Sequence, residues 1–397
     1  MTGRNSPVIT GYTAVNCLGA GREAIRAALH NGTAGLRPCD FSGADFETYI
    51  GRVDGLEDRP VTGPLARYDC RNSRLALMAL RADGFEGLAR DCIARRGARR
   101  VGLVLGTSTS GIQEGERAFG ERSDDDLPDW FDYRHTQDTH ATTEFIGAWL
   151  GIEGPCMTIS TACSSSAKVF ADADQLIAHD ICDAVIVGGV DSLCLLTLYG
   201  FRSLELTARG PCRPNDMDRD GLSIGEGGGF AIVERPRDAV SALAVLEGVG
   251  ESSDAYHMST PHPAGLGAVK SMRCALAMAD ISPDQIDYIN LHGTGSKVND
   301  IVEARAVMSL FGSDTPCSST KGWTGHTLGA AGIIEAVIAL EAIRHGFTPG
   351  NLGLERRDPE IATNILPETR AADVSRVLSN SFGFGGNNCS LLFGRVR

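Results

Sequence analysis

The chain has 397 residues, and 37 Lys and Arg stand against 50 Asp and Glu, so its formal net charge is −13 at pH 7. This length can form one large core or two fused domains. The acidic balance argues against a general nucleic-acid-binding protein. No apolar stretch approaches the ~20 residues of a membrane span, so we expect no membrane insertion.

The cysteines and the first residues indicate a reducing compartment. The twelve cysteines are scattered without C-x-x-C pairs, which argues against a zinc or disulfide framework. Residues 1–7 lead directly into a strand-like run and lack the pattern of a signal peptide. We therefore expect a cytoplasmic protein.

Strand-like apolar runs alternate with helical patterns along the chain, which is typical of an α/β protein with buried strands. No linker or low-complexity segment interrupts this alternation, and the acidic segment 120–132 is expected to be a surface loop. A division near 248–250 would give unequal halves of 1–248 and 249–397. The expected strands are 101–105, 184–187, 230–233, 288–291 and 377–379.

The segment 157–170, Met-Thr-Ile-Ser-Thr-Ala-Cys-Ser-Ser-Ser-Ala-Lys-Val-Phe, predicts a strand, a turn and a helix. Cys163 would then lie at the positive end of the helix, where a thiol is expected to have a depressed pKa and to react as a thiolate. A buried packing cysteine is the alternative, and it fits most of the cysteines in this chain. The segment alone leaves both interpretations open.

Two histidines occur in glycine-rich turns, each after an expected strand. His292 lies in Tyr-Ile-Asn-Leu-His-Gly-Thr-Gly-Ser, and His326 lies in Ser-Thr-Lys-Gly-Trp-Thr-Gly-His-Thr-Leu-Gly-Ala-Ala-Gly. Such turns are where α/β proteins hold reacting groups. Each histidine by itself is more typical of a structural role, but together with Cys163 they indicate acyl-thioester chemistry.

These three segments, in this order and spacing, resemble the elongating β-ketoacyl-acyl-carrier-protein synthases of the thiolase-like superfamily. Residues 212–227, 252–259 and 379–388 also match that family, and the similarity runs from residue 8 to the C-terminus. The resemblance implies an α/β thiolase-like fold of two similar halves in five layers, α-β-α-β-α. It also implies a homodimer, no permanently bound cofactor or metal, and substrates carried on the phosphopantetheine of an acyl-carrier protein.

The resemblance implies a decarboxylative condensation between an acyl group held on Cys163 and malonyl-acyl-carrier protein. His292 and His326 would act as neutral imidazoles that donate hydrogen bonds to the malonyl thioester oxygen. The backbone N–H groups of Cys163 and Phe384 would form a second oxyanion hole.

Lys321 is implied to lie near the site in an ion pair with Glu335, where its charge would keep His326 neutral. The remaining implied residues are Thr294 and Ser296 for the pantetheine arm, and Phe382 or Phe384 as a gate of the acyl channel. Each of these four would equally fit plain packing if the resemblance were set aside.

Four positions depart from the family pattern and concern the choice of substrate. Ser296 and Asn387 stand where threonine is frequent, Lys297 replaces a usual proline, and Trp323 is unusually bulky. We expect Ser296, Lys297 and Trp323 to alter the wall and the charge of the thioester channel. Elongation in a specialised pathway, such as polyketide or aryl-polyene synthesis, therefore stands beside ordinary fatty-acid elongation.

Three alternatives remain open. A priming synthase would use Cys-His-Asn, which the segment around His326 disfavours, and a thiolase would need a second late cysteine, for which Cys389 is in the wrong setting. A non-catalytic subunit like a chain-length factor would lack the nucleophile, yet obligate pairing with a second ketosynthase-like subunit as a heterodimer is possible from sequence. A candidate basic patch for an acidic carrier protein consists of Arg67, Arg71 and Arg74.

Overall fold

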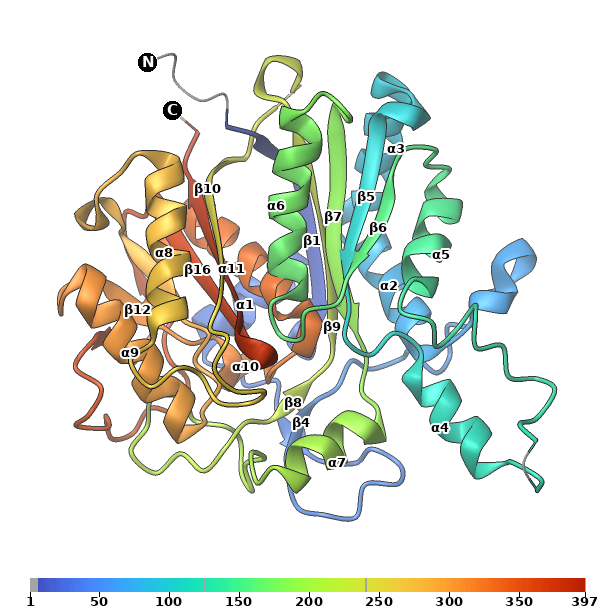
Figure 1. Ribbon diagram of the computed structural model, residues 1–397, viewed down its shortest axis with the longest axis horizontal. Helices are drawn as coiled ribbons and strands as arrows, with labels where there is room; N and C mark the ends of the chain where they lie inside the picture. The colour runs from blue at the N-terminus through green and yellow to red at the C-terminus, as the bar shows by residue number, and fades with distance from the viewer. Residues whose placement is uncertain (1–5, 125, 240, 397) are drawn as a thin grey trace.

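The computed structural model describes residues 6–124, 126–239 and 241–396, and one large mixed sheet dominates it (Figure 1). The strand order is β14-β12-β11-β16-β17-β10-β1-β9-β7-β5-β6, and β2 pairs with β1. The main strands are β1 (Val8–Asn16), β5 (Val101–Gly106), β6 (Cys156–Ile159), β7 (Ala184–Asp191), β9 (Gly227–Glu234), β10 (Ala244–Ser253), β11 (Tyr288–Asn290), β12 (Pro316–Ser318), β16 (Arg376–Gly383) and β17 (Asn387–Gly394). The short strands are β2 (Gly19–Ala20), β3 (Arg37–Pro38), β4 (Tyr49–Gly51), β8 (Ile224–Gly225), β13 (Phe347–Thr348), β14 (Asn364–Ile365) and β15 (Arg370–Ala371).

The main sheet contains the same strand topology twice. In the first unit, β5 pairs in parallel with β6 and β7, β7 is antiparallel to β9, and β9 is antiparallel to β1. In the second unit, β11, β12, β16, β17 and β10 repeat these pairings in the same order. Two residue pairs between β1 and β10 join the units. The expectation of two similar α/β halves is confirmed.

The helices form three layers around these two units. The central layer holds α6 (Ser165–Ala178) and α11 (Ala331–His345), which pack against each other and against strands of both units. The helices outside the first unit are α2 (Arg71–Arg81), α3 (Phe85–Arg96) and α5 (Ala141–Leu150), and those outside the second are α8 (Leu266–Ala279) and α9 (Lys297–Phe311). The others are α1 (Arg22–Asn31), α4 (Ile112–Gly120), α7 (Leu195–Ser203) and α10 (Lys321–Thr324). This is the expected five-layered arrangement.

Burial on both faces explains the continuous apolar runs of the strands. On β5, Val104 packs in the central core around α6 and α11, while Leu103 and Leu105 pack in the core under α2, α3 and α5. Alternate side chains of a strand point to opposite faces, so a strand between two helical layers must be apolar throughout. For the same reason α11 is buried from Ala331 to Ile343, with apolar residues on all sides.

The division between the halves is less simple than the strand repeat. The expected boundary after residue 248 lies inside β10, and α11 of the second half contacts β9 of the first. The division of the chain into separate domains 1–248 and 249–397 therefore stays a prediction.

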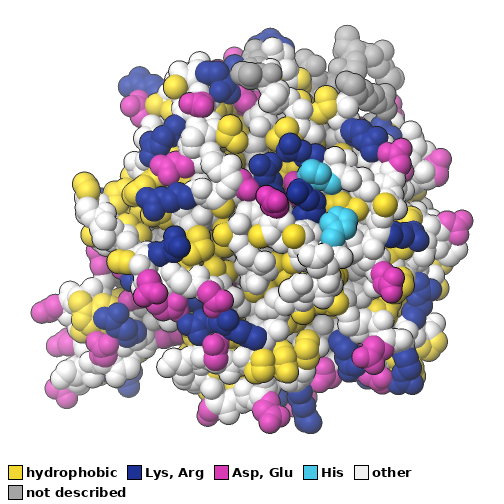
Figure 2. Space-filling model, turned by 180° about the vertical axis from the view of Figure 1, so that it is seen from behind, with side chains coloured by type: hydrophobic (Ala, Val, Ile, Leu, Met, Phe, Trp, Pro, Cys, Tyr) yellow, Lys and Arg dark blue, Asp and Glu magenta, His cyan; other side chains and the backbone are white. Residues whose placement is uncertain are grey.

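Charged side chains of both signs are interspersed on the face seen from behind in Figure 2, so the negative net charge does not form one continuous acidic field there. Among the described residues, no helix has both the length and the hydropathy needed to cross a membrane.

Candidate active site

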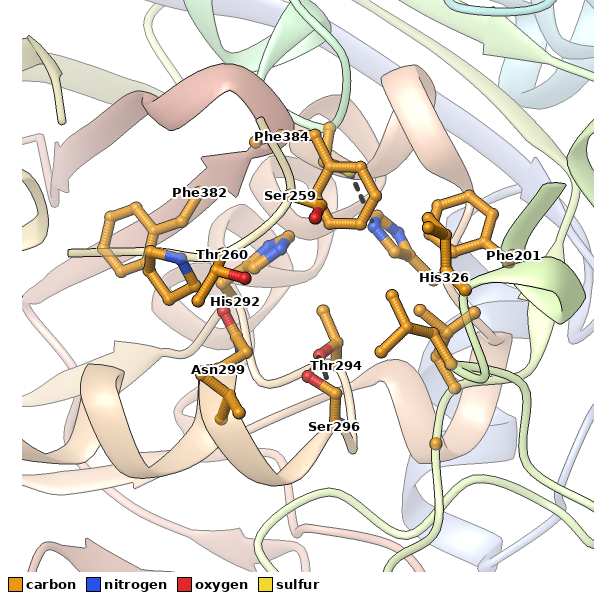
Figure 3. A pocket seen from close by; sticks show the side chains of 18 of the residues that line it. Phe201, Ser259, Thr260, His292, Thr294, Ser296, Asn299, His326, Phe382 and Phe384 are labelled. Atoms are coloured by element: carbon orange, nitrogen blue, oxygen red, sulfur yellow. Dashed lines mark hydrogen bonds between the residues drawn. The ribbon is translucent and has the colours of Figure 1, made fainter. Parts of the chain in front are cut away.

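A cavity of about 540 Å³ brings the three candidate reactive residues together. Cys163, His292 and His326 all line it, although they come from three different turns. Figure 3 shows the two histidines in the cavity. The other expected cavity residues, which also line it, are Thr294, Ser296, Phe382 and Phe384.

Cys163 lies in a tight turn between β6 and α6. Ala162, just before it, has φ +53°, a left-handed conformation that is strained for a residue with a Cβ. The turn is held by Ser165, whose hydroxyl donates to the carbonyl of Ala162 at 2.6 Å and accepts from the N–H of Thr161 at 2.9 Å. The predicted position at a helix N-terminus is confirmed, because α6 begins at Ser165.

Backbone approaches this turn closely through two glycines. A Cβ on Gly383 would lie 2.9 Å from the carbonyl oxygen of Thr161 and 3.2 Å from the nitrogen of Cys163. A Cβ on Gly332 would lie 2.4 Å from the nitrogen of Ala167 in α6. Side chains at these positions would push the nucleophile's turn out of place.

The pKa of Cys163 runs against the sequence-based expectation. Burial raises this pKa to about 11, while the charge of Lys321 and a hydrogen bond from the backbone N–H of Phe384 lower it less. The expected depressed pKa is therefore wrong for the free site, because desolvation of the thiolate outweighs the charge of Lys321 and the hydrogen bond from Phe384. The thiol needs a nearby group to take its proton.

His326 is the side chain placed next to the thiol. Its Nε2 lies 3.0 Å from Cys163 Sγ, and its ring is 5.3 Å from the ring of His292 at an interplanar angle of 84°. The sulfur and one ring nitrogen of each histidine lie within 4.8 Å of one another. This set could also ligate Zn²⁺, and ligation would block the nucleophile.

Both imidazoles are held neutral. Burial, then the charge of Lys321, lowers the pKa of His326 well below 6.5, and for His292 the neighbouring His326 adds to the same two causes. Neutral imidazoles keep one N–H each for hydrogen bonding in the cavity.

Lys321 and Glu335 lie behind the histidines, outside the cavity lining. Lys321 Nζ donates to the carbonyl oxygen of His292 at 2.5 Å, lies 3.4 Å from its Nδ1 and pairs with the buried Glu335. The expected ion pair is therefore present, but its contact is with His292 and not with His326. The ammonium holds the His292 turn from behind while its charge acts on both rings.

Two aromatic rings border the cavity near the sulfur. Phe384 lies 5.5 Å from Phe201, and Phe382 lies 6.0 Å from His292, measured between ring centroids. Figure 3 shows Phe384 on one side of the cavity, with Thr294 and Ser296 on the other. The hydroxyls of Thr294 and Ser296 are 3.1 Å apart, where they could bind a polar chain that enters the cavity.

Lys297 and Trp323 differ in their relation to the cavity. Lys297 is exposed and lines the mouth of the cavity as the first residue of α9. Trp323 is buried in the central core and donates from Nε1 to the carbonyl of Gly350 at 3.1 Å. The expectation that Trp323 shapes the channel wall is wrong, because its side chain packs into the core.

The sequence interpretation missed two buried carboxylates next to the site. Glu303 on α9 accepts the backbone N–H groups of His292 and Gly293, each at 2.8 Å. Asp191 at the end of β7 binds the turn that follows His326. An acid shortly after the expected strand 184–187, and one in the helix after the His292 turn, were the available signals.

The comparisons with known proteins agree with this geometry. Residues 71–239 match the N-terminal domain and residues 243–355 the C-terminal domain of β-ketoacyl synthases. The 3-oxoacyl-[acyl-carrier-protein] synthase 2 of Coxiella burnetii is 32% identical over 98% of both chains. The mitochondrial 3-oxoacyl-[acyl-carrier-protein] synthase of Arabidopsis thaliana is 39% identical, over 62% of this chain and 58% of that relative.

Solved structures show the same similarity. A ketosynthase (ApeO) in complex with its chain length factor (ApeC) from Xenorhabdus doucetiae is 38% identical, with a TM-score of 0.89 over 99% of this chain and 98% of that one. The ishigamide ketosynthase/chain length factor is 27% identical, with a TM-score of 0.90 over 99% and 100%. By its sequence and its structure, the chain belongs to the β-ketoacyl synthase family.

Proposed function

We propose that the protein is a decarboxylating β-ketoacyl-acyl-carrier-protein synthase that elongates an acyl chain by two carbons. The observation that carries this proposal is the convergence of Cys163 Sγ with two neutral imidazoles in one cavity. A thiol nucleophile and two N–H donors are the groups that acyl transfer and enolate formation require.

The first half-reaction loads the acyl group. Cys163 Sγ attacks the thioester carbonyl, a new carbon–sulfur bond forms, and the bond to the carrier's pantetheine sulfur breaks. The thiol proton passes to the departing sulfur, with His326 Nε2 at 3.0 Å as the relay. The N–H groups of Cys163 and Phe384 are proposed to stabilise the oxyanion, which agrees with the hydrogen bond that Phe384 makes to the sulfur.

The second half-reaction uses the malonyl thioester. The bond between its methylene carbon and its carboxylate carbon breaks, and carbon dioxide leaves. The electron pair is delocalised onto the thioester oxygen, which accepts hydrogen bonds from His292 and His326. The resulting carbanion then attacks the acyl thioester and expels the sulfur of Cys163. Preorganised donors of this kind are worth ~10²–10³ in rate each.

Replacement of the nucleophile tests this reaction. Cys163→Ala is expected to abolish formation of the acyl-enzyme because no sulfur remains, which intact-protein mass spectrometry with acyl-carrier thioesters can measure. Cys274→Ala is the matched control, because Cys274 is the exposed cysteine of the described chain and lies outside the cavity lining. Acyl transfer that survives in Cys163→Ala but is lost in Cys274→Ala would refute the assignment.

An acyl-carrier protein is the proposed partner for substrate delivery. The candidate basic patch fits only in part, because Arg71 is buried and bound by Glu226 at 2.5 and 2.8 Å, and Arg74 is paired with Asp69 at 2.6 Å. Arg67 lies over the ring of Tyr68 at 5.2 Å and has no carboxylate within ion-pair distance in the described residues. Lys297 at the mouth of the cavity is a second basic residue available to the carrier arm.

A second ketosynthase-like chain is the other proposed partner, and the edge strand β6 supports it. All four residues of β6 are only partly buried, whereas β5 and β7 are fully buried. The carbonyls of Pro155 and Ile159 accept from Leu103 in β5 and from Thr107 just after it, so the peptide groups of Cys156 and Thr158 face the free edge. An unpaired edge of this kind is a template for pairing with another chain.

The edge-strand pairing can be tested with one substitution. Cys156→Pro removes an outward N–H and is expected to shift the oligomer toward the monomer, while Cys156→Ala keeps the N–H and serves as control. Light scattering after gel filtration, with the chain alone and with a co-expressed chain-length-factor-like subunit, measures the mass. Equal masses for both variants would exclude β6 as the interface. A dimer of the chain alone indicates a homodimer, whereas a dimer that forms only with the co-expressed subunit indicates a heterodimer.

A further inference from the structure

Asp191 is a fully buried carboxylate to which the reaction above assigns no role. It accepts hydrogen bonds from the backbone N–H groups of Ser108 at 2.8 Å, Thr109 at 2.9 Å and Gly329 at 2.5 Å. The hydroxyls of Thr107 and Thr109 donate to it at 2.7 and 2.8 Å. One side chain thus ties the loop after β5 to the turn before α11.

The turn before α11 carries His326. Leu328, two residues later, has φ +54°, which is strained for a residue other than glycine. Gly329 approaches Asp191 so closely that a Cβ there would lie 2.7 Å from Oδ2. The hydrogen bond from Gly329 therefore helps to hold a strained turn in the conformation that places the imidazole.

The loop after β5 touches the turn of the nucleophile. Ser108 donates its hydroxyl to the carbonyl oxygen of Ala162 at 3.3 Å. Ala162 is the strained residue directly before Cys163. Asp191 is therefore one contact away from each of the two strained turns, through Gly329 on one side and through Ser108 on the other.

We propose that Asp191 is a positioning residue that holds the Cys163 turn and the His326 turn in register, and so sets the 3.0 Å between Sγ and Nε2. A small displacement of reacting groups is costly, since ~1 Å can lower a rate by ~10²-fold. The proposal rests on the proposed function for the reaction that this spacing serves, but it can be tested on the thiol of Cys163 without any substrate.

Asp191→Asn removes the contact with little change in shape. Backbone N–H groups cannot turn away, and an amide offers one acceptor oxygen where the carboxylate offers two. The N–H of Thr109 and the hydroxyls of Thr107 and Thr109 meet Oδ1, the N–H of Gly329 meets Oδ2, and the N–H of Ser108 reaches both oxygens at 2.8 and 3.1 Å. Because an NH₂ group at the Oδ2 position keeps the donors at Oδ1 paired, the amide is expected to release the turn of His326.

The experiment measures alkylation of Cys163 by iodoacetamide against pH, and then the two half-reactions. In Asp191→Asn we expect alkylation near neutral pH to slow by ~10-fold and malonyl decarboxylation to fall by ~10- to 10²-fold. A purely electrostatic role would give the opposite sign for alkylation. The negative charge of Asp191 raises the pKa of Cys163, so its removal alone would speed the reaction.

Two further variants keep the test decisive. Glu234→Gln removes a buried carboxylate that accepts from Thr10 and Arg96 at the far end of β9, and it should lower stability while leaving alkylation unchanged. Gly329→Ala should displace the carboxylate by its Cβ and reproduce the effects of Asp191→Asn.

Unchanged or faster alkylation in folded Asp191→Asn would overturn the proposal. Loss of the fold in both Asp191→Asn and Gly329→Ala would overturn it too, in favour of a role in stability alone. If alkylation slows as expected in Asp191→Asn but the wild-type enzyme condenses no acyl carrier, the proposed function fails while the positioning role stands.

Discussion

His292 and His326 are expected to share one task and to differ in another. His292→Ala and His326→Ala should each lower malonyl decarboxylation by ~10²–10³-fold, because each removes an N–H donor to the enolate oxygen. Only His326 contacts Cys163 Sγ, so only His326→Ala should also slow alkylation of the thiol. Release of carbon dioxide and alkylation rates measure the two effects.

His257→Ala is the matched control for these variants, because His257 is an exposed histidine of the same cavity. It should change decarboxylation by less than ~3-fold, since it lies outside the cluster of reacting atoms. Normal carbon dioxide release in either His292→Ala or His326→Ala would contradict the paired-donor mechanism. The lowered pKa values also predict no loss of decarboxylation by imidazole protonation between pH 8 and 6.5.

Lys297 is expected to act on the carrier arm. Its exposed ammonium at the cavity mouth can meet the phosphate of phosphopantetheine, so Lys297→Pro should raise KM for acyl-carrier substrates by several-fold and leave kcat unchanged. Proline is tolerated at this position because it is the first residue of α9. Kinetics with carrier-bound substrates, compared with pantetheine thioesters that lack the phosphate, measure the difference.

The acyl preference of the wild-type enzyme tests the substrate hypothesis separately. Native enzyme that prefers long saturated chains over conjugated ones would reject the specialised substrate hypothesis. A KM for carrier-bound substrates that is the same in Lys297→Pro as in the wild type would remove this residue from carrier recognition.

At the scale of single residues, the sequence predicted which side chains meet but not their environment. His292 and His326 were found because glycine-rich turns after strands are visible as patterns, and Cys163 because the segment around it predicts a strand, a turn and a helix. The pKa of Cys163 could not be predicted, because it depends on burial by segments more than 160 residues apart, such as the turn of His326. The core position of Trp323 was missed for the same reason.

At the scale of elements, α9 is attached to the His292 turn by a titrating group. Burial raises the pKa of Glu303 to about 7, although hydrogen bonds from Gly293 and His292 oppose the shift. The folded state therefore binds this proton more tightly than the unfolded chain, where the pKa is about 4.3. The contribution of this bound proton to the free energy of unfolding is complete below pH ~4.3 and is lost as the pH rises to about 7.

Glu303→Gln should remove this part of the pH dependence. Thermal unfolding at several pH values between 4.5 and 8 measures it in both proteins, and the difference in Tm between them should change across that window and be flat above it. Asp287→Asn is the control, since this partly buried carboxylate accepts hydrogen bonds from the backbone N–H groups of Ser375 and Arg376 away from the cavity. Parallel curves for wild type and Glu303→Gln would show that this carboxyl does not titrate in the window.

At the scale of the whole molecule, the duplication was implied by resemblance and could not be derived from the pattern. The α/β class follows from alternating runs, and β5, β7, β9, β11 and β16 lie where strands were expected. The pairing of β1 with both β9 and β10, by contrast, joins segments more than 200 residues apart. Strand periodicity specifies that a face is buried, not which strand covers it.

The buried central helices also constrain how the chain can be made. A ribosome releases α6 long before α11 exists, yet α6 is covered in the folded protein by α11 and by strands of both units. The growing chain must therefore keep the apolar face of this helix from aggregating until almost the last residues have been synthesised. Because α6 begins two residues after Cys163, the reactive thiol acquires its environment only at the end of synthesis.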